Sequence, residues 1–146
     1  MPVENPLPCL LDSNIWLYAF VEQGEPQKQA AAKQLLEQPA VVVSTQIINE
    51  VCFNLRRKAD FTEEQIKRLI YSFYLRYSVT ALDQTIMLAA AELRSRYSFS
   101  FWDSLVVAAA LHAGCKLLYT EDMQHGLFVD ERLRILNPFA AFSVST

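Results

Sequence analysis

Short apolar runs alternate along this chain with longer segments in which apolar residues recur at helical spacing. The short runs are rich in β-branched and large apolar residues and are too short for buried helices, so they predict β-strands. Five runs of this kind follow one another: "CLL" before Asp12, "AVVVS", "YSVTAL", "CKLLYT" and "LRILNP", the last expected at a sheet edge.

The segments between these runs carry apolar residues every three to four positions, which predicts amphipathic helices. Residues that start or end helices mark their limits. They are Pro26, Ser44 or Thr45, Thr62, Asp83 and Ser100 at helix starts, and Gly114 at a helix end. Strands that alternate with helices predict an α/β fold, with a mostly parallel central sheet of about five strands and helices on both faces.

The chain contains only three glycines and no Gly/Ser-rich or Pro-rich stretch that would serve as a linker. With 52% hydrophobic residues in 146, it can bury a substantial core. We therefore expect one domain spanning residues 1–146. No apolar run reaches the length of a membrane span and no charged leader precedes an apolar stretch, so we expect a cytoplasmic protein without membrane contact.

Four acidic residues stand beside apolar segments that we expect to be buried. They are Asp12 in "CLLDSNIW", Glu50 in "TQIINEV", Asp103 in "FWDSLVVAAAL" and Asp122 in "KLLYTEDMQHG". A lone carboxylate is costly at such a position. Asp12 and Asp122 each follow a predicted strand, and sites in parallel sheets form beyond the carboxyl ends of strands. The four acids therefore indicate a shared metal-binding pocket.

Taken singly, three of these acids have simpler explanations. Asp12 suits a turn or a helix cap, Asp103 completes a capping box with Ser100, and Asp122 suits a solvated loop. Glu50 lies about a turn and a half into its predicted helix, among apolar residues, where capping cannot explain it. The shared pocket is the one hypothesis that accounts for all four acids together.

Clustered carboxylates repel one another unless a cation neutralises them. Oxygen ligands favour Mg²⁺ or Mn²⁺, and no Cys/His pairing has zinc spacing. Asn14 and Thr120 lie beside the same predicted edge and could orient a carboxylate or water, although ordinary turn polarity explains them equally well. The three cysteines are widely spaced in apolar runs, which is typical of buried free thiols in a reducing compartment.

Five motifs in this order resemble the PIN-domain ribonucleases, and specifically the VapC-type toxins of bacterial toxin–antitoxin pairs. They are "LLDSNIWLYAF", "STQIINEV", "FWDSLVVAAAL", "LLYTEDMQHG" and "LRILNPF", from about Cys9 to Phe139. The resemblance implies a three-layer α/β/α domain and RNA phosphodiester hydrolysis that depends on Mg²⁺ or Mn²⁺. It also implies a cognate antitoxin as partner and a homodimer.

The resemblance assigns roles residue by residue. Asp12, Glu50, Asp103 and Asp122 match the four acids of the family, which hold the metal and carry catalysis. Asn14 and Thr120 match the supporting residues beside the first and fourth acids. Glu121 is an additional acid whose role the pattern does not fix.

The formal net charge of −3 leaves RNA binding to a local basic patch. Arg56, Arg57 and Lys58 form the best candidate, although a solvated helix end explains them equally well. Tyr71, Phe73, Tyr74 and Tyr77 could stack unpaired bases, but an antitoxin or dimer contact is the interpretation we prefer. His125 suits a turn better than a phosphate contact. Trp16 and Trp102 are expected to pack and shape the pocket.

Two other functions fit parts of the pattern. One is a receiver-type phosphoacceptor domain, which also has an α/β fold and an acidic Mg²⁺ pocket, but paired early acids are missing and Lys116 precedes its strand. The other is a non-catalytic PIN module that binds RNA or a protein partner, against which the complete acid set argues.

Overall fold

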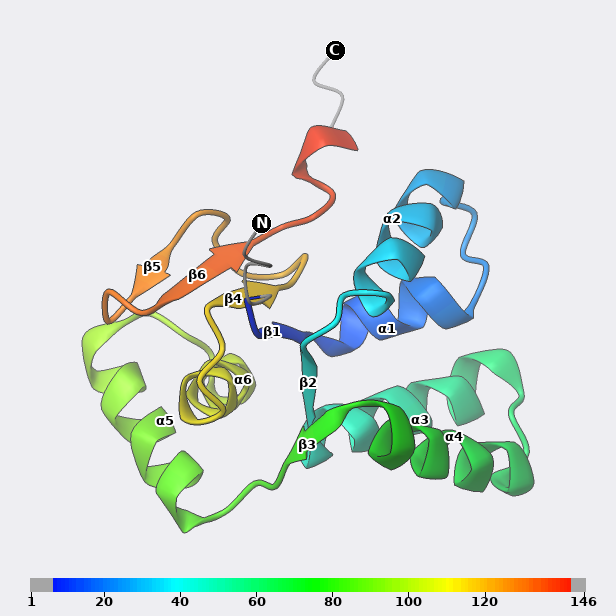
Figure 1. Cartoon of the computed structure of the whole chain (residues 1–146), viewed down its shortest axis with the longest axis horizontal. Coiled ribbons are helices and arrows are strands. Elements are labelled where there is room, and N and C mark those ends of the chain that lie inside the picture. The colour runs from blue at the N-terminus through cyan, green and yellow to red at the C-terminus, as the bar shows by residue number, and fades with distance from the viewer. Residues whose placement is uncertain (1–6, 143–146) are drawn as a thin grey trace, which may run out of the picture.

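A six-stranded sheet organises the protein, whose computed structural model describes residues 7–142 (Figure 1). The strands are β1 (Cys9–Leu11), β2 (Val41–Ser44), β3 (Ser78–Thr80), β4 (Leu117–Tyr119), β5 (Phe128–Val129) and β6 (Leu133–Leu136). Their order across the sheet is β3-β2-β1-β4-β6-β5. All neighbours are parallel except β5 and β6, which are antiparallel.

Helices cover both faces of this sheet. They are α1 (Ser13–Phe20), α2 (Pro26–Leu36), α3 (Thr45–Ala59), α4 (Glu63–Arg76), α5 (Gln84–Arg96) and α6 (Phe101–His112), followed by a short 3-10 helix (Ala140–Phe142). In Figure 1, helices α1 to α4 lie on one side of the strands and α5 and α6 on the other. The three-layer α/β/α architecture predicted from the sequence is confirmed.

Two details of the predicted sheet are wrong. The sheet has six strands within the described residues, not about five, because Phe128–Val129 adds a two-residue antiparallel strand. As a result "LRIL" is not at the edge: β6 pairs with β4 on one side and with β5 on the other. A two-residue strand is too short to show a periodic pattern in the sequence, so it is recognised only from its pairing with β6. The predicted domain also includes residues 1–6 and 143–146, which lie outside the described residues.

The predicted helix caps are largely those observed. Ser44 accepts a hydrogen bond from the Ile47 amide at 3.1 Å, which resolves the alternative between Ser44 and Thr45. Thr62 and Gln65 form the complete capping box, and Asp83 and Ser100 cap α5 and α6. Local polar residues thus fix where the helices begin, because each side chain satisfies an amide that has no partner within the helix.

Helix α6 packs against both the sheet and its neighbour α5. Every residue from Ser104 to Leu111 is buried, because α6 packs against α5 and against strands β2 and β4. A helix that is apolar all round is stable only in such an enclosed position. This packing fixes the first turn of α6, and with it Asp103, relative to the sheet. No helix in the described part of the chain is both long and apolar enough to span a membrane.

Candidate active site

The strand order reverses between the neighbouring strands β1 and β4. Strands β2 and β3 continue the sheet from β1 on one side, and β6 and β5 continue it from β4 on the other. In open parallel sheets, ligands bind beyond the carboxyl ends of the strands at this switch point. Leu11 pairs with Tyr119 in the register of these strands, and the Asp12 amide donates to the Tyr119 carbonyl at 3.0 Å. Asp12 and the segment Thr120–Asp122 therefore leave the sheet side by side.

Asp12 is the most deeply buried of the four predicted acids, with 5% of its surface exposed. Its Oδ1 accepts from the Ser13 amide at 2.8 Å, so it does cap α1. Its Oδ2 accepts from the Thr120 hydroxyl, also at 2.8 Å. Burial raises the pKa of Asp12 to about 6, against the lowering effect of these two bonds, and the negative charges of Glu50 and Asp103 raise it further.

Since the charges of Glu50 and Asp103 both act on Asp12, each of these two acids lies within electrostatic range of Asp12. Asp103 senses Asp122 in turn: burial first, and then the charge of Asp122, raises the pKa of Asp103, while Ser100 lowers it. Asp103 lies in the first turn of α6, and Glu50 lies on α3, where it accepts from Gln46 at 3.1 Å. Asp12 and Asp122 thus share Thr120 as a hydrogen-bond partner, and the charges of Glu50 and Asp103 reach Asp12.

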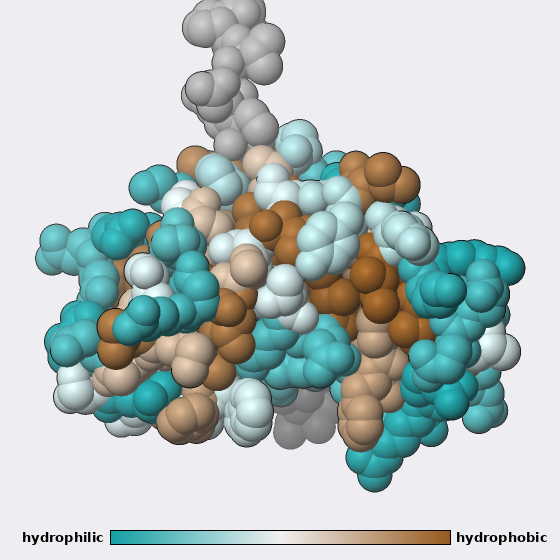
Figure 2. All heavy atoms as spheres, turned by 90° about the horizontal axis from the view of Figure 1, so that it is seen from below, coloured by the Kyte–Doolittle hydropathy of each residue, from teal (hydrophilic) through white to brown (hydrophobic). Residues whose placement is uncertain are grey.

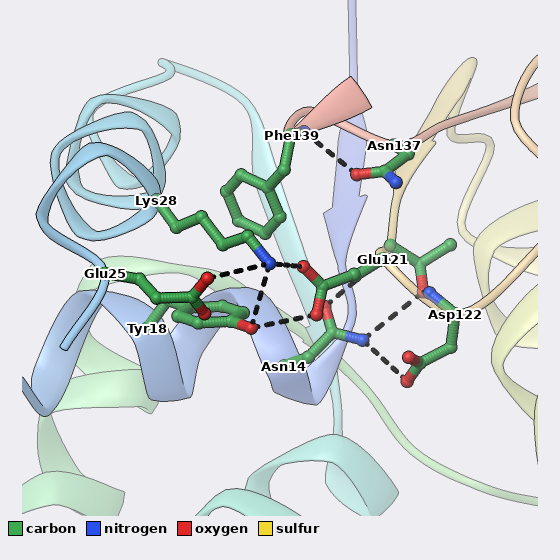
Figure 3. A network of polar contacts seen from close by, with 9 residues as sticks. Asn14, Tyr18, Glu25, Lys28, Glu121, Asp122, Asn137 and Phe139 are labelled. Atoms are coloured by element: carbon green, nitrogen blue, oxygen red, sulfur yellow. Dashed lines mark hydrogen bonds and ion pairs between the residues drawn. The ribbon is translucent and has the colours of Figure 1, made fainter. Parts of the chain in front are cut away.

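A residue of helix α1, Asn14, forms a hydrogen bond with Asp122. The Asn14 side chain donates from Nδ2 to Asp122 Oδ2 at 2.9 Å, and its Oδ1 accepts from the Glu121 amide at 3.4 Å (Figure 3). The Thr120 hydroxyl also accepts from the Asp122 amide at 3.2 Å. Asn14 and Thr120 therefore contact the acids beside which the sequence placed them.

No basic side chain within the described part of the chain forms an ion pair with these acids. The five ion pairs found within residues 7–142 include none of the four acids. The oxygen-only donor set and the uncompensated charge fit a hard divalent cation. However, no group of three or more His, Cys, Asp or Glu side chains in the described chain is arranged to hold one. The acids form a loose cluster and not a preformed cage.

A surface hollow opens beside two of the acids. Its volume is about 360 Å³, and Asp103 and Asp122 line it together with the loop between α5 and α6. Tyr97 and Phe99 of that loop also line it, with ring centroids 5.4 Å apart. A larger hollow between α3 and α4, of about 600 Å³, is lined by none of the four acids. The smaller hollow is therefore the one that borders the candidate site.

The predicted basic cluster lies further along α3. Arg56 follows Glu50 by six residues, or about 9 Å along the helix axis. Its side chain is engaged, because it pairs with Glu63 at 2.9 Å and donates to the Phe61 carbonyl at 2.7 Å. Arg57 and Lys58 are exposed. A role of these three residues in RNA binding stays a prediction.

The predictions for the remaining aromatic and histidine residues had mixed outcomes. Trp16 is fully buried and donates to the Leu11 carbonyl at 3.0 Å, as its predicted packing role requires. The same prediction for Trp102 is wrong, because its side chain is 65% exposed. It occupies the first turn of α6 before the buried stretch begins. His125 accepts from the Asn137 amide at 2.9 Å, which fits a turn residue.

Sequence reasoning missed one polar cluster next to the acids. Glu121 pairs with Lys28 of α2 at 2.6 Å and accepts from the Tyr18 hydroxyl of α1 at 2.9 Å (Figure 3). Lys28 and Glu121 are 93 residues apart, and no motif links them. Only the packing of α2 against α1 brings Lys28 to the end of β4.

Comparison with known proteins identifies the fold family. The model of the PIN domain family matches residues 9–126, which contain all four acids. No curated protein matches the chain.

Several solved structures share this fold at low sequence identity. A chain of a toxin–antitoxin complex from Klebsiella pneumoniae is 20% identical, with a TM-score of 0.67 and coverage of 89% of this chain and 97% of that chain. The sarcin–ricin loop cleaving toxin VapC20 of Mycobacterium tuberculosis is 17% identical, with a TM-score of 0.61 and coverage of 75% and 86%. VapBC-1 of nontypeable Haemophilus influenzae is 18% identical, with a TM-score of 0.59 and coverage of 90% and 98%.

Proposed function

Because the chain belongs to the PIN domain family, we propose that it is a metal-dependent endoribonuclease that acts as the toxin of a toxin–antitoxin pair. The strand order supports this proposal over a receiver-type phosphoacceptor. Receiver sheets follow the order 2-1-3-4-5, whereas β1 here lies between β2 and β4.

The observation that carries the proposal is the burial of the Asp12 carboxylate without a basic partner among the described residues. A buried carboxylate with a raised pKa, close to two further acids and without a basic partner among the described residues, is unfavourable in a purely structural role. Strongly perturbed carboxylates in such clusters are typical of functional sites. A cation bound by these acids would offset both the cost of burial and the repulsion.

The residues that would hold Mg²⁺ or Mn²⁺ are Asp12, Glu50, Asp103 and Asp122. When bound, such an ion makes a water molecule nucleophilic and stabilises negative charge on the scissile phosphate. The chain itself orients the acids: Thr120 fixes one oxygen of Asp12, and Asn14 fixes one oxygen of Asp122. The other oxygen of Asp122 carries no protein hydrogen bond within the described residues.

Two exposed aromatic side chains support a single-stranded substrate. Phe101 and Trp102 are 61% and 65% exposed and directly precede Asp103. The Arg94 guanidinium lies 4.1 Å from the centre of the Phe101 ring, which adds positive charge to the same surface. Unpaired RNA bases stack on exposed rings of this kind, whereas paired bases do not present their faces.

The proposed partners are an antitoxin and a second copy of the chain. The solved structures of similar fold include toxin–antitoxin complexes. Helices α4 and α5 expose large apolar side chains that a lone domain would normally bury. They are Tyr71, Tyr74, Leu75, Met87 and Leu88. Figure 2 shows apolar side chains gathered towards the middle of the lower face, between hydrophilic margins.

The direct test is RNA cleavage by the purified protein, free of any antitoxin. We expect cleavage with Mg²⁺ or Mn²⁺ and none after chelation. Asp12→Asn and Asp103→Asn should each reduce the cleavage rate by at least about 100-fold, because each removes a charge from the metal site. Glu37→Gln is a matched control, since Glu37 is an exposed acid near the start of β2, away from the carboxyl ends of the strands.

The outcomes separate the competing functions. Full activity of both Asn variants would show that the site is assigned wrongly. RNA binding without cleavage, over a series of metals and RNA substrates, would support a non-catalytic module instead. Measurement of the molar mass by light scattering, with and without a co-expressed neighbouring reading frame, tests the homodimer and the antitoxin.

A further inference from the structure

Two consecutive acids at the end of β4 have opposite electrostatic surroundings. Asp122 belongs to the unneutralised acid cluster and is held by Asn14, whereas Glu121 is fully engaged with a basic residue (Figure 3). Glu121 and Asp122 are joined by a single peptide bond. Whatever fixes Glu121 therefore also restricts where Asp122 can lie.

Both carboxylate oxygens of Glu121 have a partner. Lys28 Nζ donates to Oε2 at 2.6 Å, and the Tyr18 hydroxyl donates to Oε1 at 2.9 Å. The side chains of Lys28 and Glu121 are 23% and 25% exposed, so this ion pair is shielded from water more than an ordinary surface pair.

The rest of the cluster fixes Lys28 itself. Its ammonium lies 3.4 Å from Glu25 Oε1 and about 5 Å from the rings of two aromatic residues, 5.2 Å for Tyr18 and 5.5 Å for Phe139. The bond to Glu121 raises the pKa of Lys28, so the ammonium stays charged. Lys28 is therefore a fixed cation that α2 presents to the end of β4.

Asn14 links this cluster to the acids. Its Oδ1 accepts from the Glu121 amide at 3.4 Å, while its Nδ2 donates to Asp122 at 2.9 Å and lies 3.5 Å from the Thr120 hydroxyl. One amide side chain thus contacts three successive residues. Its geometry depends on the position of the Glu121 backbone, which the ion pair to Lys28 holds against α1 and α2.

Lys28 also prevents Glu121 from acting as an extra site acid. Without a cation, this carboxylate would add negative charge next to Asp122 and could turn towards any ion bound there. Paired with Lys28, it points away from Asp122 in Figure 3. The sequence alone left the role of Glu121 open, and the structure shows it paired with Lys28 and Tyr18.

We propose that Lys28, acting through Glu121, is a positioning residue for Asp122. The ion pair holds the segment Thr120–Asp122 in the geometry that lets Asn14 and Thr120 orient the acids, and it keeps Glu121 out of the acid cluster. The proposal rests on the nuclease function for its effect on catalysis, but not for its effect on the geometry of the metal-free protein.

The test compares Lys28→Met with Lys28→Arg, which keeps a charged donor for Glu121. Lys33→Met is the matched control, because it removes the same charge from an exposed position of the same helix. Nuclear magnetic resonance of the metal-free protein reports the Asn14 side-chain amide, which bonds Asp122. Titration of Mg²⁺ in the RNA cleavage assay reports the concentration for half-maximal rate.

We expect Lys28→Met to shift and broaden the Asn14 side-chain signals and to raise the half-maximal Mg²⁺ concentration about tenfold, as loss of a residue that orients metal ligands typically does. Lys28→Arg should restore most of both properties, and Lys33→Met should leave both unchanged. In a Glu121→Gln background, Lys28→Met should have a smaller effect on both, because the proposed route runs through Glu121.

A Lys28→Met protein that only melts at a lower temperature, with unchanged Asn14 signals and Mg²⁺ requirement, would overturn the proposal. So would an equal effect of Lys28→Met with and without Glu121→Gln. If the wild-type protein cuts no RNA, the proposed function fails, while the Asn14 signals still decide whether Lys28 positions Asp122.

Discussion

The Thr120 hydroxyl donates a hydrogen bond of 2.8 Å to Asp12 Oδ2, across 108 positions of sequence. The hydroxyl oxygen of Thr120 in turn accepts from the Asp122 amide at 3.2 Å. Thr120 is fully buried. A single hydroxyl therefore connects the first and fourth acids and fixes the relative position of the two strand ends that carry them.

Replacement of Thr120 tests this connection. Thr120→Val keeps the shape of the side chain but leaves Asp12 Oδ2 and the Asp122 amide without their shared partner. We expect the affinity for Mg²⁺, measured by calorimetry, and the RNA cleavage rate each to fall by about 10- to 100-fold. Thr120→Ser keeps the hydroxyl and should retain most of both. Equal losses in the two variants would show that shape, and not the hydrogen bond, matters at this position.

The raised pKa of Asp12 predicts a pH-dependent stability. In the unfolded chain its pKa is close to 3.8, and in the folded protein it is about 6. The protonated form therefore stabilises the fold at low pH, and this contribution is lost as the pH rises from about 4 to about 6. At pH 7 the ionised carboxylate lowers the free energy of unfolding by about 3 kcal/mol at most, because its pKa differs by roughly 2 between the folded and the unfolded chain.

Asp12→Asn removes this titration. In urea unfolding of the metal-free proteins, the variant should be more stable than wild type at pH 7, and the difference should shrink towards zero near pH 4. The comparison with wild type at each pH cancels the contributions of other groups, such as Asp130, whose pKa Arg96 lowers. A stability difference between Asp12→Asn and wild type that is the same at both pH values would contradict the raised pKa of Asp12.

Metal binding by the acid cluster should be visible without RNA. A ligand that binds only the folded protein stabilises it by about 2.7 kcal/mol at 100 times its dissociation constant. We therefore expect Mg²⁺ or Mn²⁺ to raise the melting temperature of the wild-type protein. Asp12→Asn should lose most of this increase, and Glu37→Gln should retain it. Equal increases in all three proteins would place the cation elsewhere.

The exposure of Trp102 gives a test of substrate contact. The protein has two tryptophans: Trp16 is fully buried and Trp102 is 65% exposed. Unpaired RNA in the presence of chelator should therefore quench mainly the fluorescence of Trp102. Because stacking of one base contributes about 1–3 kcal/mol, Trp102→Ala should weaken RNA binding roughly tenfold or more.

Phe53→Ala serves as the control for this experiment, since Phe53 is comparably exposed at 60% but lies on α3 beside the larger hollow. It should leave RNA affinity unchanged. If both variants bind RNA as wild type does, the exposed rings of α6 face a protein partner instead.

The sequence by itself determined most of the helices and strands and singled out the four acids as candidates. Strand runs such as "AVVVS" and caps such as Ser44 and Thr62 act over a few residues, so their patterns can be read locally. The acids were recognisable because each stands beside an apolar segment that was expected to be buried. The proximity of Asp12 and Asp122 followed from the parallel sheet, since the carboxyl ends of β1 and β4 share one edge.

Only the tertiary structure decided which groups these acids and their neighbours contact. The pairing of Lys28 with Glu121, the exposure of Trp102 and the two-residue strand β5 all depend on how segments far apart in sequence pack. A local sequence pattern does not predict such contacts, because the same lysine, tryptophan or apolar pair would suit several environments. The position of α2 against α1, and of α6 against the sheet, selects one environment for each.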